Sequence, residues 1–122
     1  MKTQRTFSDI EYGKRKRVSR REIFLKKMDT LIPWEELIGV IQPCYYAGKR
    51  GRPPRGIEMM LRMYLLQIWY NLSDEMTEET IYDSHAMKEF AKVDFWEESV
   101  PDATTLLGFR HMLEREKLYV IL

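Results

Sequence analysis

Apolar residues recur along most of the chain with the spacing of one face of an α-helix. In the clearest segment they stand at i, i+3, i+4, i+7, i+8, i+11 and i+12. These positions are Ile57, Met60, Leu61, Tyr64, Leu65, Ile68 and Trp69. A stripe of this width is typical of a helix at the centre of a core. We therefore predict that this face points inward, with Leu65 and Trp69 buried.

Two further helices are predicted before this central segment. Ser19 and Glu22 match a capping box, which predicts a helix over about 20–31. Pro33 suits the first position of the next helix, and Pro43 is expected to end it, because proline disrupts a helix interior. The apolar face of this second helix is formed by Trp34, Leu37, Ile38 and Ile41.

Short helices are predicted to follow the central segment. Ser73 is a good N-cap for an acidic helix, and the helical pattern continues to about Ala91 with a break near Ser84. Asp102 is expected to cap a last helix over about 103–117. The residues predicted to face inward are Ile81, Tyr82, Met87, Phe90, Leu106, Phe109 and Leu113.

These patterns predict an all-α fold, since the sequence contains no sustained strand pattern. We expect a flexible basic arm at 1–18 and a small helical domain of five or six helices at 19–122. Loops are predicted at 43–56, which is rich in glycine and proline, and at 94–101. The short helices from residue 74 to residue 115 could form a helix-turn-helix-like unit with the last helix as its recognition helix.

Charge is divided unevenly along the chain, although the formal net charge is only +1. Residues 1–27 hold ten Lys or Arg against three acids, whereas residues 71–99 hold nine acids against two lysines. Such asymmetry usually means that one face meets an anionic partner while another is solvated or meets a basic one. The 122 residues are 44% hydrophobic and 32% charged, which is typical of a folded globular domain.

The sequence also bears on where the chain resides. No apolar run approaches the ~20 residues that a membrane span needs, and the polar start contains no secretory signal pattern. The single cysteine, Cys44, fits a reducing compartment. We expect a soluble cytoplasmic chain with no membrane partner.

Candidate catalytic residues are sparse. Three acids stand at helical spacing, namely Glu78, Glu79 and Asp83. Metal-dependent nucleases need carboxylates that converge from different elements, so a solvated face or compensation of the helix dipole explains these acids better. His85 and His111 lie far apart, and neither they nor Cys44 belong to a cluster with metal-ligand or nucleophile spacing. We expect no catalytic residue, no metal site and no cofactor.

Basic residues in two places favour DNA binding. An arm running into a helix and a loop of glycine, proline and arginine can neutralise phosphates or enter a narrow minor groove. The alternatives are a solubilising tail and a basic surface turn. The candidates are Lys14, Arg15, Lys16, Arg17, Arg20 and Arg21 in the arm and helix, and Lys49, Arg50, Arg52 and Arg55 in the loop.

Three residues of the last predicted helix, Thr104, Thr105 and Arg110, are candidates for base recognition rather than phosphate contact. Arg110 has a second interpretation. It could pair with an acid of the 71–99 segment and serve the fold instead.

Blocks of residues from Gly51 onward resemble a known family. They are Gly51-Arg52-Pro53-Pro54, the run from Met60 to Asp74, Glu78-Glu79, the run from Ile81 to Ser84, Met87, Phe90, the run from Val100 to Leu106, Phe109-Arg110-His111 and Leu113-Glu114. Together they resemble the N-terminal domain of the transposases of insertion-sequence family five. The similarity covers at least residues 30–118, and its blocks follow one another in order.

The resemblance implies a helical domain that binds the terminal inverted repeats of a transposon and helps to pair the two ends. In relatives a ribonuclease-H-like domain with an Asp-Asp-Glu metal triad follows. Asp102 falls in the front domain's Pro-Asp-X-Thr-Thr pattern, so no catalytic role is carried over to it, and Ala103 stands where an acid is common. The ending after Leu118 is expected to reflect a truncation, a frameshifted element or the first of two overlapping frames.

The leading hypothesis is recognition of double-stranded DNA at transposon ends, without strand cleavage, in the bacterial cytosol and nucleoid. Such a product could also repress a full-length transposase by occupying its sites. The protein partners would be a second copy or the full-length transposase. Two rival hypotheses are a pure interaction module, whose acidic 71–99 segment meets a basic partner, and an enzyme completed by a second chain that supplies the triad.

Overall fold

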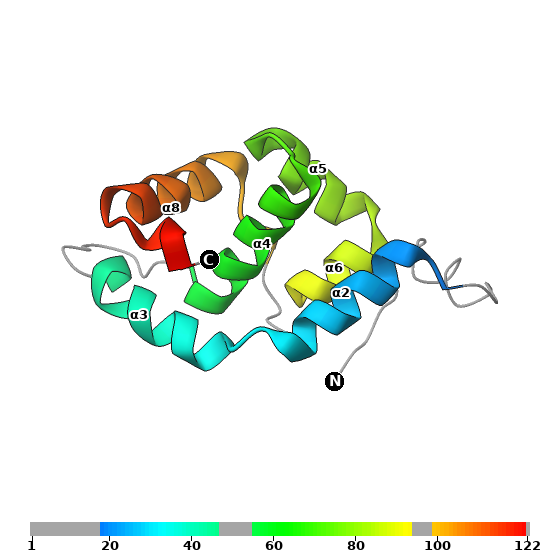
Figure 1. Cartoon of the computed structure of the whole chain (residues 1–122). Coiled ribbons are helices and arrows are strands. Elements are labelled where there is room, and N and C mark those ends of the chain that lie inside the picture. Colours follow the sequence, from blue (N-terminus) through cyan, green and yellow to red (C-terminus); the bar gives the residue numbers. More distant parts are fainter. Residues whose placement is uncertain (1–17, 47–54, 94–98, 122) are drawn as a thin grey trace.

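The structure, a computed structural model, describes residues 18–46, 55–93 and 99–121. These residues form helices and contain no strand, which confirms the all-α prediction (Figure 1). The elements are α2 (Arg20–Leu31), α3 (Trp34–Tyr46), α4 (Ile57–Tyr70), α5 (Asp74–Asp83), α6 (His85–Ala91), α8 (Ala103–Arg115) and the short 3-10 helix η1 (Leu118–Ile121). None of the described helices is both long enough and apolar enough to cross a membrane.

Side-chain caps fix where four helices begin, because each supplies an acceptor to an amide that has no partner within its helix. Ser19 Oγ accepts from the Glu22 amide at 3.1 Å, and Ser73 Oγ accepts from the Met76 amide at 3.1 Å. The predicted break at Ser84 and the cap at Asp102 are confirmed in the same way. Ser84 Oγ accepts from Met87 N at 3.3 Å, and Asp102 Oδ1 accepts from Thr105 N at 2.9 Å.

Helix α4 is the centre of the body and contacts α3, α5, α6 and α8 (Figure 1). Every residue from Leu61 to Gln67 is buried, so the helix is enclosed on all sides rather than along one stripe. Leu65 is buried as predicted, but Trp69 is only partly buried and Ile68 is 50% exposed. The prediction for Ile68 is therefore wrong. This residue belongs to the last turn of α4, where the chain leaves the helix through the left-handed residue Asn71.

Pro43 does not end α3, contrary to the prediction, and the helix continues to Tyr46. A proline inside a helix removes one hydrogen bond and crowds the carbonyl four residues earlier. Here it lies near the end of the helix, where the buried pair Ile41 and Tyr45 holds the last turns against the core. The hydroxyl of Tyr45 also donates to the carbonyl of Arg55 at 2.6 Å, across the 47–54 segment. The start of α3 is one residue later than predicted, at Trp34.

Two other predictions need correction. Ile81 is fully buried, but its neighbour Tyr82 is 50% exposed, because Tyr82 points about 100° away from Ile81 around the helix axis, toward the side of α5 that no other described helix covers. The last helix ends at Arg115 rather than 117, since Lys117 adopts a left-handed conformation before η1. The remaining inward predictions in α6 and α8 are confirmed. They are Met87, Phe90, Leu106, Phe109 and Leu113.

Candidate nucleic-acid interface

Helix α8 presents one face to the core and the opposite face to solvent. Its core face carries Leu106, Phe109 and Leu113, and the Phe109 ring packs edge-on against Tyr45 and Tyr64, with ring centroids 5.7 and 6.2 Å away. These contacts tie α8 to α3 and α4. A helix held in this way can present its other face with little freedom to rotate.

Four exposed residues on the solvent side of α8 follow a helical spacing of i, i+4, i+7 and i+11, and a fifth exposed residue, Glu114, lies beside them. We call the four the α8 outer face, formed by Thr104, Gly108, His111 and Arg115. None of the four is acidic, and the space where a Cβ of residue 108 would lie is open to 4 Å. Only Thr104 was predicted from the sequence. The other three could have been found from their spacing opposite the core residues of the same helix.

Two acids of α5, Asp74 and Glu78, bind groups of α8. The Arg110 guanidinium donates to Asp74 Oδ2 at 2.8 Å, and Gln67 Nε2 of α4 donates to the other oxygen of Asp74 at 2.8 Å. Glu78 Oε1 accepts from the Ala103 amide at 3.0 Å and so helps to cap the first turn of α8. Of the six acids in the 71–99 segment that the structure describes, Asp74 and Glu78 therefore serve the fold.

These contacts place the three predicted base-contacting residues differently. Thr104 is exposed on the α8 outer face, whereas Thr105 is half-buried and its amide donates to Asp102. Arg110 forms the ion pair that its second interpretation described. Contact of any of the three with DNA stays a prediction.

The predicted phosphate-contacting residues fall mostly outside the described part of the chain. This is the case for Lys14, Arg15, Lys16, Arg17, Lys49, Arg50 and Arg52. Of the others, Arg20 is exposed and Arg21 stacks its guanidinium over the Tyr70 ring at 4.8 Å. Arg55 donates to the carbonyl of Ser99 and to the sulfur of Met59, at 3.7 Å for the latter, so it links the start of α4 to the approach to α8.

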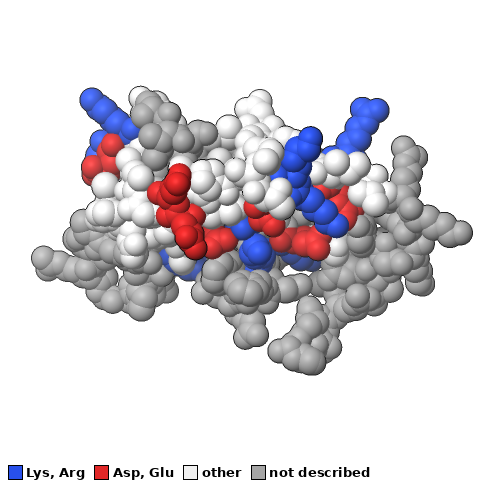
Figure 2. Space-filling model, turned by 60° about the horizontal axis from the view of Figure 1, so that its bottom comes forward, with Lys and Arg blue, Asp and Glu red and all other residues white. Residues whose placement is uncertain are grey.

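The described body itself is not basic. It holds eleven Lys or Arg and fourteen Asp or Glu, whereas the remaining residues hold nine and five. Figure 2 shows acidic and basic side chains interspersed on one face of the body rather than a single field of either sign. The surplus of positive charge therefore lies in the segments 1–17 and 47–54. The helix ends to which these segments are joined, at α2 and at α3 and α4, lie at opposite ends of the molecule (Figure 1).

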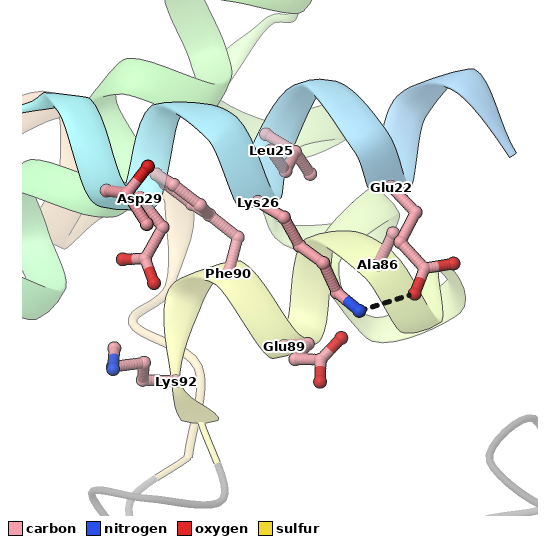
Figure 3. A pocket seen from close by; sticks show the side chains of 9 residues that line it. Glu22, Leu25, Lys26, Asp29, Ala86, Glu89, Phe90 and Lys92 are labelled. Atoms are coloured by element: carbon pink, nitrogen blue, oxygen red, sulfur yellow. Dashed lines mark ion pairs between the residues drawn. The ribbon is translucent and has the colours of Figure 1, made fainter. Parts of the chain in front are cut away.

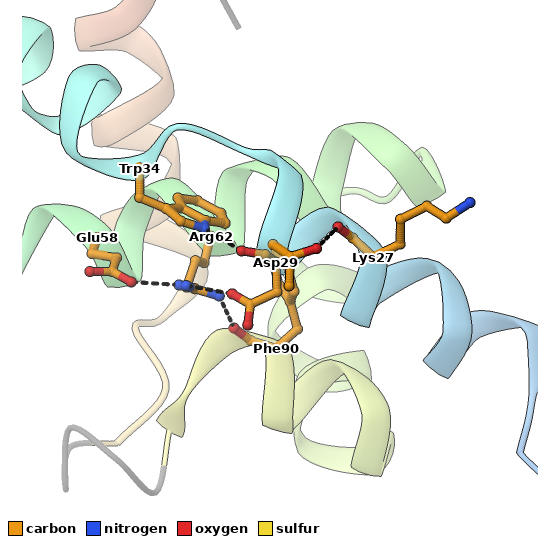
Figure 4. Close-up of polar contacts among 7 residues, drawn as sticks. Lys27, Asp29, Trp34, Glu58, Arg62 and Phe90 are labelled. Carbon is orange, nitrogen blue, oxygen red and sulfur yellow. Dashed lines mark hydrogen bonds and ion pairs between the residues drawn. The ribbon is translucent and has the colours of Figure 1, made fainter.

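A buried arginine organises the other half of the body. Arg62 of α4 is 3% exposed, and its guanidinium binds Asp29 Oδ1 at 2.8 Å, Glu58 Oε2 at 2.9 Å and the carbonyl of Phe90 at 2.9 Å (Figure 4). It also lies over the rings of Trp34 and Phe90, at 4.1 and 5.0 Å from their centroids. The indole of Trp34 donates to the Asp29 carbonyl at 2.9 Å. The side chain of Arg62 thus joins α2, α3, α4 and α6, and its role is structural.

A groove of about 420 Å³ runs between α2 and α6 (Figure 3). Leu25, Ala86 and Phe90 line it, and charged side chains surround them. Each of its three carboxylates has a cationic or imidazole neighbour: Glu22 lies 3.1 Å from Lys26, Asp29 lies 2.8 Å from Arg62, and Glu89 lies 3.9 Å from His85. Among the described residues, no group of three or more His, Cys, Asp or Glu is placed to hold a metal ion.

Residues 14–112 match the model of a protein family described as "Transposase domain (DUF772)". The chain belongs to this transposase-domain family. The match begins at the basic run of the arm and ends within α8, so it includes α2 to α6 and most of α8. No solved structure matches the chain.

Proposed function

We propose that this transposase domain binds double-stranded DNA at the terminal inverted repeats of a transposon, as the front domain of an insertion-sequence family five type transposase. The observation that carries the proposal is the family match, which begins at the four-residue basic run Lys14–Arg17. A transposase must recognise the ends of its transposon, and the residues that match the family include the most basic stretch of this chain. Phosphate neutralisation by such a stretch gives affinity for any duplex.

Direct recognition of a DNA sequence uses contacts with base edges, and the α8 outer face is the best candidate for them. Thr104, His111 and Arg115 carry hydrogen-bonding groups, and Gly108 between them leaves room for close approach. Arg110 is a weaker candidate, since Asp74 already binds its guanidinium. None of the four residues of the α8 outer face is acidic, which suits them to an anionic ligand, although the exposed Glu114 lies beside Arg115 at the edge of this face.

We further propose that the chain does not cut DNA alone. The resemblance places the Asp-Asp-Glu triad of these transposases in a separate domain. Purified chain should therefore leave an end-containing duplex intact with magnesium or manganese. Nicking that is abolished by changing an acid of this chain would contradict this part of the proposal.

Fluorescence anisotropy tests the binding, with one labelled duplex that carries the terminal repeat and a scrambled duplex of equal length. Arg15→Ala should weaken binding to both duplexes equally and lower the slope of log K against log salt by ~0.9. His111→Ala should cost about 1–3 kcal/mol on the terminal repeat and little on the scrambled duplex. Equal losses on both duplexes from His111→Ala would remove the α8 outer face from base recognition.

A further inference from the structure

Helix α2 exposes basic and apolar side chains together. Apart from Thr30, every fully exposed residue of this helix is basic or apolar, and its two acids are turned toward α4 and α6. We call the exposed set the α2 outer face, represented by Arg20, Ile23, Phe24, Lys27 and Leu31. Ile23 and Leu31 are 57% and 66% exposed. Neither Arg20 nor Lys27 forms an ion pair within the described part of the chain.

Helix α5 exposes the opposite combination. Its exposed residues, the α5 outer face, are Glu75, Met76, Glu79, Tyr82 and Asp83. None of these residues is basic, and Met76 and Tyr82 are each about half exposed. On the inner side of α5, Asp74 pairs with Arg110 and Glu78 accepts a hydrogen bond from the Ala103 amide, whereas the three outer acids have no ion-pair partner among the residues that the structure describes.

The two faces match in charge, in apolar content and in length. Helices of twelve and ten residues are about 18 and 15 Å long at 1.5 Å per residue. Scattered exposed apolar residues need no explanation, but several on one helix face, flanked by unpaired charges of one sign, are typical of a contact surface. Because both faces belong to the same chain, a second copy always presents the matching face.

We propose that the α2 outer face of one copy binds the α5 outer face of a second copy. The contact would bury the apolar residues of both helices and pair Arg20 and Lys27 with acids of α5. DNA is a poorer fit for the α2 outer face, because phosphates would pair with its basic side chains but leave Ile23 and Leu31 exposed. The proposal goes beyond DNA binding and does not depend on it.

Sedimentation equilibrium of the full chain at low salt tests the contact, since opposite charges contribute most there. The mass should rise above the 14.7 kDa of one chain as concentration increases. Lys27→Glu and Glu79→Lys should each weaken self-association by roughly tenfold or more, because each places like charges opposite one another. An equimolar mixture of the two variants should associate again, since each then offers the other a matching face.

Glu36→Lys, a charge reversal at an exposed acid of α3, is the matched control and should associate as the parent does. At a concentration too low for association, thermal unfolding of all four proteins should coincide, because the altered side chains are exposed. A chain that stays at one-copy mass at every concentration would overturn the proposal. So would reversal variants that associate like the parent, including the case in which Lys27→Glu loses only DNA affinity.

Discussion

Arg62 and Arg110 both join helices through carboxylates, yet they differ in how far they are withdrawn from water. The side chain of Arg62 is 3% exposed and meets two carboxylates, a carbonyl and two aromatic rings. Arg110 is 28% exposed and binds one carboxylate, that of Asp74, at 2.8 Å. Its Nε atom is buried without a hydrogen-bond partner among the described residues.

Arg62 is a buried charge that only stabilises the fold, whereas Arg110 is a partly exposed charge at the surface. Each of the three nitrogens of the Arg62 guanidinium has a partner on α2, α4 or α6, and the side chain is buried, so this arginine is not available to a ligand. Arg110 lies beside the α8 outer face and fixes α8 against α5 while part of it still meets solvent. A count of arginines in the sequence does not distinguish these two situations, whereas partners and burial do.

The largest effect is expected for Arg62→Ala, which should lower the free energy of unfolding by about 4 kcal/mol. Removing one member of a buried ion pair leaves its partners uncompensated, and here the cation–π contacts with Trp34 and Phe90 are also lost. Arg62→Lys keeps the charge but not the planar fork, and should lose less. Urea unfolding measures both variants, and an Arg62→Ala protein as stable as the parent would contradict the role given to this cluster.

Leu65→Ala should cost about 3 kcal/mol, since it removes a buried side chain of α4 and leaves a cavity. Ile68→Ala, three residues later on the same helix, should change stability by less than about 1 kcal/mol, because half of Ile68 is already exposed. The difference between the two urea midpoints tests the packing of α4. Equal midpoints would show that the central helix is not placed as described.

Arg110→Ala should have a smaller effect, about 1–2 kcal/mol, because it leaves Asp74 with the Gln67 hydrogen bond only. Its effect on DNA is the sharper test of the comparison. If Arg110 serves the fold, the ratio of affinities for terminal-repeat and scrambled duplex should not change in a folded mutant. A ratio that falls tenfold at unchanged stability would move Arg110 into the base-contacting set.

The smallest effect concerns pH. Burial raises the pKa of the Tyr64 hydroxyl above its ordinary value, Glu114 adds to the increase, and Arg110 partly offsets it. In the unfolded chain this hydroxyl loses its proton at lower pH than in the fold, so stability is complete below pH ~10 and declines as pH rises further. Arg110→Ala should therefore raise the pKa of Tyr64 further. Ultraviolet titration of the parent and of Tyr64→Phe measures it, and an ordinary Tyr64 pKa would contradict its burial.

Much of the fold could be predicted from the sequence, because caps and helical spacing are local. Ser19, Ser73, Ser84 and Asp102 each mark a helix start where the structure has one. The errors arose where tertiary contacts outweigh local preference. Pro43 lies inside α3 because packing of Tyr45 holds the last turn.

The candidate interface was less predictable. Local pattern gave Thr104 and Thr105 the same predicted role but did not show that Thr105 is half-buried while Thr104 is exposed. The partner of Arg110 lies 36 residues away in the sequence, and that of Arg62 on α2 lies 33 residues away. Such pairings depend on how helices pack, and no spacing within one helix encodes them.

The most direct test of DNA-end recognition is the affinity of the unmodified chain for terminal-repeat and scrambled duplexes across a salt series. If the six basic residues Lys14–Arg17, Arg50 and Arg52 contact phosphates, log K should fall with log salt at a slope of about −5 on both duplexes. At each salt concentration the terminal repeat should bind at least tenfold more tightly, which corresponds to about 1.4 kcal/mol. Equal affinities for the two duplexes, or binding that is insensitive to salt, would contradict the account.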